Sequence, residues 1–140
     1  MIVAATARGA RVGDRHTNAH APLLVQLSDL VDQLLKATAA HEWPTVELHR
    51  LVSFLRSDVM RQIAREELVL LRSRGASSTV AQLGRDHARL CAVTEVLERA
   101  AAGEGSGSIE ELEATARSLV IQLERHIRVE RELLGALEPR

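Results

Sequence analysis

Apolar residues recur every three or four positions along most of the chain, which is the period of one face of an α-helix. The repeat runs through four segments, at about 18–40, 44–74, 77–102 and 108–137. The connections between them are short, and residues 103–107 are rich in glycine, as is typical of a loop. Four helices joined in this way predict an all-α fold, an up-down-up-down antiparallel four-helix bundle.

Local end signals support these boundaries. Pro44 is well suited to the first position of a helix, because its missing N–H would have no partner there. Ser108 with Glu111 three residues later is typical of a capping box at a helix N-terminus. Residues 1–17 show no sustained period, so we expect an irregular N-terminal arm over 1–17 and the bundle domain over 18–140.

The composition excludes several classes of protein. Trp43 and Phe54 are the only aromatic residues, whereas β-sheet proteins draw heavily on aromatic residues for their strands. Lys and Arg total 18 against 19 Asp and Glu, so the basic surface of a nucleic-acid-binding protein is missing. We therefore expect no nucleic-acid partner.

The sequence also suggests where the protein works. A single cysteine, Cys91, cannot form an internal disulfide, which fits a reducing compartment. No apolar run is long enough to span a bilayer. The short apolar stretch at the start precedes its charges, the reverse of the order in a signal peptide. We expect a cytoplasmic protein without a membrane partner, either a monomer or a homodimer.

Polar residues interrupt the inward-facing stripes of the second and fourth segments. His126 and Glu130 lie four positions apart on the same face as the leucines of the fourth segment. Gln62 and Glu66 have the same spacing in the second segment. Each pair therefore points towards the core, close enough together to bind a common centre.

The first and third segments add further inward histidines. His20 and His87 lie near the starts of their segments, and Cys91 follows His87 by one turn. In an up-down-up-down bundle, these starts lie at the same end as the finishes of the second and fourth segments. The polar side chains should therefore converge at one level of an otherwise aliphatic core.

Buried carboxylates need a positively charged partner. Ionised Glu is almost never buried unless it is paired or bound to a cation, and no inward-facing Lys or Arg accompanies Glu66 and Glu130. His with carboxylate suits iron, zinc or manganese. We therefore predict a metal site, with Gln62 and Cys91 as further candidate ligands. The predicted ligands are His20, Glu66, His87, His126 and Glu130.

Taken in order, these motifs resemble the hemerythrin-like (HHE cation-binding) family. Its pattern is a His on the first helix, His-x-x-x-Glu on the second, a His on the third and His-x-x-x-Glu or a close variant on the fourth. The resemblance covers about residues 18–138. The matching residues are His20, Gln62-Ile63-Ala64-Arg65-Glu66, His87 and His126-Ile127-Arg128-Val129-Glu130.

The resemblance implies a non-haem di-iron centre. Glu66 and Glu130 would bridge the two iron ions, His87 and His126 would serve one of them, and His20 the other. Such centres bind or react with dioxygen, peroxide or nitric oxide, or sense iron. Ferritin-like di-iron bundles fit less well, because their Glu-x-x-His pairs do not occur in this chain.

Two positions depart from the family pattern. Gln62 stands where the family has His and offers only a neutral amide oxygen to a metal, so the iron served by His20 would lack a ligand. Cys91 stands where hemerythrins proper carry another His. Its thiolate could bind metal, although a buried Cys is more often a small core residue.

Three functions therefore stay open at the level of sequence. The first is a di-iron protein that binds, senses or detoxifies a small diatomic ligand or peroxide, or senses iron. The second is a site for one iron or zinc ion held by His87, His126 and the two Glu residues. The third is a degenerate bundle without metal that works as an interaction module. No catalytic motif is present beyond the metal site, so turnover of peroxide or nitric oxide is left open.

Overall fold

The computed structural model describes residues 12–74, 78–104 and 107–137. The first helix, α2, spans Val12–Ala39, and the last two, α5 and α6, span Ser78–Ala101 and Ile109–Leu137. Between α2 and α5 the chain forms one long helical segment in three parts. These parts are α3 at Thr45–Phe54, a π-helical turn, η1, at Leu55–Val59, and α4 at Met60–Arg74.

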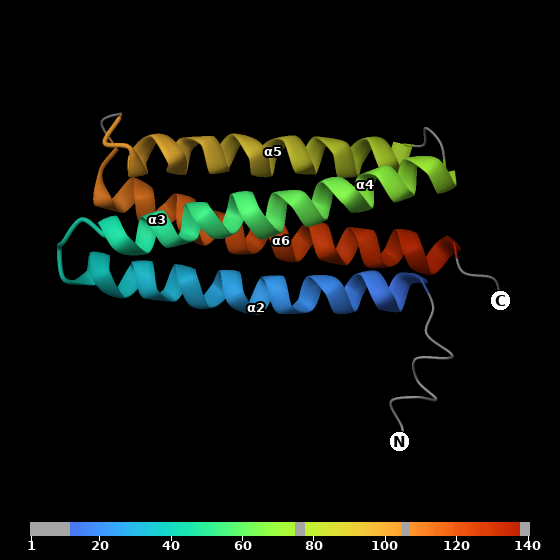
Figure 1. The fold of residues 1–140 in the computed structure, drawn as a ribbon, viewed down its shortest axis with the longest axis horizontal. Coiled ribbons are helices and arrows are strands. Elements are labelled where there is room, and N and C mark those ends of the chain that lie inside the picture. The colour runs from blue at the N-terminus through green and yellow to red at the C-terminus, as the bar shows by residue number, and fades with distance from the viewer. Residues whose placement is uncertain (1–11, 75–77, 105–106, 138–140) are drawn as a thin grey trace, which may run out of the picture.

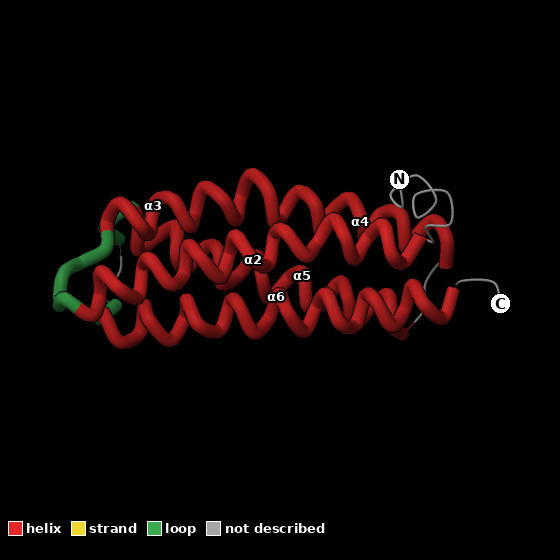
Figure 2. The backbone as a smooth tube through the Cα atoms, turned by 90° about the horizontal axis from the view of Figure 1, so that it is seen from below, coloured by secondary structure: helices red, strands yellow, loops and turns green. Residues whose placement is uncertain are grey.

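The helices lie side by side along one long axis, as two perpendicular views show (Figures 1 and 2). α2 packs against α6 and α3, and α5 packs against α6, α3 and α4. Sequence neighbours run antiparallel, so the starts of α2 and α5 share one end of the bundle with the finishes of α4 and α6 (Figure 1). The predicted up-down-up-down four-helix bundle is confirmed.

The core consists almost entirely of aliphatic side chains. Burying each leucine contributes roughly 1.5–3 kcal/mol, so this shell supplies much of the stability of the fold. All four helical segments contribute to it. Its fully buried members include Leu27, Leu34, Leu48, Leu51, Leu55, Ile63, Leu90, Leu97, Leu119 and Leu123.

The cap predicted at the start of the last helix is present. The backbone N–H of Glu111 donates a hydrogen bond to the Ser108 hydroxyl oxygen over 3.1 Å. This bond satisfies one of the N–H groups that a helix start otherwise leaves without a partner. α6 accordingly begins at Ile109, directly after the capping residue.

The first helix begins earlier than its apolar pattern predicts. α2 starts at Val12, so residues 12–17 are helical where we expected an irregular arm, and residues 1–11 lie outside the described part. Pro22 therefore lies inside the helix rather than in its first turn, and its ring removes one helical hydrogen bond. The apolar period could not reveal this part of the helix, because no run of apolar residues at helical spacing covers residues 12–17.

The π-helical turn η1 changes which residues of α4 face the core. A π-turn adds one residue to the helical repeat and so rotates the residues that follow it. After η1, Ile63 is fully buried, whereas Gln62 is only half-buried. Glu66 remains inside at 3% exposed.

Candidate metal centre

Polar side chains from three helices form a layer inside the bundle, in the half nearer the start of α5. Three of its members are the ligands predicted from α4 and α6. Glu66, His126 and Glu130 are 3%, 1% and 2% exposed, respectively, so they are core residues. We call this set the polar layer; it comprises Glu66, Glu67, Asp86, His87, His126 and Glu130.

The two predicted pairs lie as their spacing requires. On α4, the side-chain amide of Gln62 donates a hydrogen bond to Oε1 of Glu66 over 2.7 Å. On α6, Nε2 of His126 lies 3.3 Å from Oε2 of Glu130. Gln62 therefore acts as a hydrogen-bond partner of Glu66.

His87 joins α5 to α4 through Glu67, a residue outside the predicted ligand set. Its Nδ1 lies 2.7 Å from Oε2 of Glu67, and both side chains are 20% exposed. Glu67 follows Glu66 directly, so it lies off the inward-facing stripe of the second segment. The approach of α5 half-buries it against His87.

Asp86 is a second member of the layer that lies outside the predicted ligand set. It is 8% exposed, and its Oδ1 accepts a hydrogen bond of 3.0 Å from the Gln82 amide. Leu83 and Leu90 are seven residues apart, so both Asp86 and His87 fit the face between them. The predicted ligand is His87, but the structure buries Asp86 more deeply.

The surroundings of His126 combine burial with nearby negative charge. Burial lowers the pKa of this imidazole, while the negative charges of Asp86, Glu67 and Glu66 act in the opposite direction. Carboxylates of α4 and α5 therefore lie within electrostatic range of a histidine on α6. With its pKa lowered, His126 is neutral at pH 7, which is the form that binds a metal ion.

The remaining candidates differ in what the structure shows. His20 belongs to α2, but its side chain lies outside the described residues. Cys91 is half-buried, and its Sγ lies 3.5 Å from Sδ of Met60 on α4. Burial raises the pKa of the Cys91 thiol. These surroundings are those of a small core residue, as the commoner interpretation of Cys91 predicted.

The donor chemistry of the polar layer fits a cation. It offers carboxylates and imidazoles, and two buried carboxylate oxygens, Oε1 of Glu67 and Oδ2 of Asp86, have no hydrogen-bond partner among the described residues. Iron, zinc and manganese accept such donors. Among the described side chains, however, no three His, Cys, Asp or Glu lie close enough to enclose a metal ion. The ligand set therefore stays a prediction.

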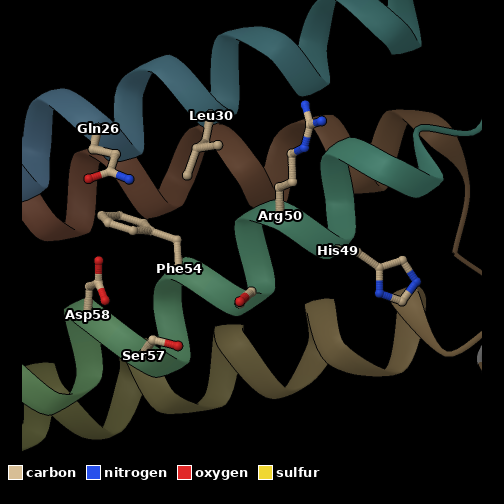
Figure 3. Close-up of a pocket in the computed structure, with 8 residues that line it drawn as sticks. Gln26, Leu30, His49, Arg50, Phe54, Ser57 and Asp58 are labelled. Carbon is tan, nitrogen blue, oxygen red and sulfur yellow. The ribbon is translucent and has the colours of Figure 1, made fainter.

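A groove elsewhere on the bundle contains none of the predicted ligands. It lies between α2 and the α3–η1 segment, and Figure 3 shows the His49 ring turned away from Phe54. Its lining includes both the positively charged Arg50 and the negatively charged Asp58, so the groove does not favour a ligand of one charge. Its lining residues are Gln26, Leu30, His49, Arg50, Ser53, Phe54, Ser57 and Asp58.

The fold and the polar layer define an all-α bundle with histidine and carboxylate on its inner faces. The family model of the hemerythrin HHE cation binding domain matches residues 5–137. The chain therefore belongs to the hemerythrin HHE family of cation-binding domains. No curated protein and no solved structure matches the chain significantly. Within the described residues, no helix has the length and apolar character needed to cross a membrane.

Proposed function

We propose that this protein binds iron in the polar layer and uses it to bind, sense or detoxify a small ligand such as dioxygen, peroxide or nitric oxide. The proposal depends chiefly on the burial of Glu66, His126 and Glu130, none more than 3% exposed. Burying carboxylates in an aliphatic core is costly unless they are paired or bound to a cation, and the family to which the chain belongs binds cations. Among the described side chains, Arg89 and Arg125 lie beside Asp86 of the layer and remain exposed.

Each residue of the layer has a distinct task in this proposal. Neutral His126 provides a nitrogen lone pair, and Glu66 and Glu130 provide the negative charge that holds a cation. Leu119 and Leu123 precede His126 on α6 and are fully buried, so they keep bulk water away from the layer. Bound iron would supply an open coordination position for the small ligand. No tyrosine exists in the chain to donate a hydrogen bond to that ligand.

A centre with a single metal ion, iron or zinc, is the second candidate. It is favoured by the hydrogen bond of 2.7 Å from Gln62 to Glu66, because this amide takes up a carboxylate oxygen and supplies no nitrogen ligand. His87, His126 and the two buried Glu residues would then form the whole ligand set. His20 would remain outside it.

Metal analysis of the full chain purified from iron-supplemented cells tests both candidates. Two iron ions per chain with near-ultraviolet charge-transfer absorption support the di-iron centre, and one iron or zinc supports the single site. His126→Ala should lose the metal, whereas His49→Ala, which removes an exposed histidine outside the layer, should retain it. Colourless, metal-free wild-type protein would overturn the proposal and favour an interaction module.

A further inference from the structure

We infer that Glu67 is a positioning residue for His87, fixing the proton on Nδ1 so that Nε2 is the nitrogen that binds the metal. The inference rests on the proposed function. It adds to the centre a residue that lies outside the predicted ligand set.

The contact between the two side chains sets the protonation pattern of the ring. A neutral imidazole carries its proton on one nitrogen and a lone pair on the other. Oε2 of Glu67 lies 2.7 Å from Nδ1 of His87, and a carboxylate can only accept a hydrogen bond there. The proton therefore lies on Nδ1, and the lone pair on Nε2. Carboxylates commonly orient metal-binding histidines in this way.

The position of Glu67 supports a role within the layer rather than at the rim. Besides contacting His87 on α5, the carboxylate carries a charge that acts on the buried His126 of α6 and on Cys91 of α5. Its second oxygen, Oε1, is buried and has no hydrogen-bond partner among the described residues. The hydrogen bond to His87 is therefore the contact that holds this carboxylate in place.

A purely structural role would make different predictions. If the contact only tied α4 to α5, removing it would lower the stability of the metal-free bundle and would leave the intrinsic metal affinity unchanged. If Glu67 positions His87, removing it changes the ring tautomer and weakens metal binding, even where the bundle remains folded. The tautomer and the affinity are therefore the decisive measurements.

The tautomer can be measured in metal-free full-length protein by long-range proton–nitrogen NMR correlation spectra. Signals of His87 are assigned by their loss in His87→Gln. We expect the Nδ1–H form in wild type and in Glu67→Gln, whose amide oxygen can still accept the hydrogen bond. Glu67→Ala should shift His87 towards the Nε2–H form. The matched control is Glu132→Gln, an exposed carboxylate on α6, which should behave as wild type.

Affinity for cobalt(II), measured by competition with a chelator, provides the second arm. Glu67→Ala should weaken binding roughly 10- to 100-fold, the usual effect of removing such a partner. Glu67→Gln should lie between Glu67→Ala and wild type. Either an unchanged tautomer or an unchanged affinity in a folded Glu67→Ala protein would overturn the role of Glu67 and leave the proposed function standing. A wild-type protein that binds neither cobalt nor iron would overturn the proposed function as well.

Discussion

The side-chain amide of Gln62 donates a hydrogen bond of 2.7 Å to Oε1 of Glu66, one turn further along α4. This pair stands where the family pattern has His-x-x-x-Glu. An imidazole at position 62 would offer a nitrogen lone pair, whereas the amide offers an N–H and thereby occupies an oxygen of Glu66. The residue at position 62 therefore decides whether the bundle has a nitrogen ligand for a second metal ion.

Replacing Gln62 with His should increase the iron bound per chain. The substitution removes the amide that occupies Glu66 and supplies the missing nitrogen ligand. Iron content after purification from iron-supplemented cells provides the measurement. Gln26→His, an exposed glutamine on α2, is the matched control and should not raise the iron content. Equal iron in both variants would place Gln62 outside the ligand set.

The stability of the metal-free protein should fall as the pH drops below about 6.5, the ordinary pKa of histidine. Burial lowers the pKa of His126 in the folded state, so the unfolded chain takes up a proton that the folded chain does not. This contribution is fully present above the unfolded pKa and is lost as the pH falls from there towards the folded pKa. Urea unfolding at pH 7.5 and 5.5 measures the loss.

The contribution of His126 can be separated from that of other histidines. His126→Gln should reduce the difference in unfolding free energy between the two pH values, even if it lowers stability at both. His49→Gln, at an exposed histidine of α3, should leave the difference unchanged. A wild-type difference that survives in His126→Gln would contradict the assignment.

The thiol of Cys91 should react slowly with iodoacetamide in the folded protein. Burial is the main cause of its raised pKa, and the negative charges of Glu67 and Glu95 add to it, while Arg56 acts against them. Because the thiolate is the reacting form, the labelling rate should reach half its maximum above pH 9.0, the ordinary value for this thiol. Labelling in urea is the control. Rapid labelling of folded protein at pH 7.5 would contradict this account.

Thr38→Val should destabilise the bundle by about 1–3 kcal/mol, independently of metal. The Thr38 hydroxyl is buried and donates a hydrogen bond of 2.7 Å to Oε2 of Glu113, which joins α2 to α6. Valine keeps the shape of the side chain and leaves the carboxylate without this donor. Thr115→Val is the matched control, because that hydroxyl bonds only within its own helix. Chemical unfolding of both variants measures the difference.

Much of the fold followed from the sequence, because helix periodicity is a local property. The spacing of leucines located the helical segments, and short connections made sequence neighbours antiparallel. The same periodicity placed Glu66, His126 and Glu130 inside, where the structure buries them. The turn of α2 over residues 12–17 was not predictable, because no apolar stripe accompanies it.

The contacts between helices could not be predicted from the apolar stripe of any one helix. Glu67 meets His87, and Asp86 acts on His126, because of how far each helix is rotated and how closely its neighbour approaches. The π-helical turn η1 adjusts that rotation for α4. By itself, then, the sequence determined which residues face inward, since that depends on spacing along one helix. Only the tertiary structure decided which of them meet, since that depends on packing between helices.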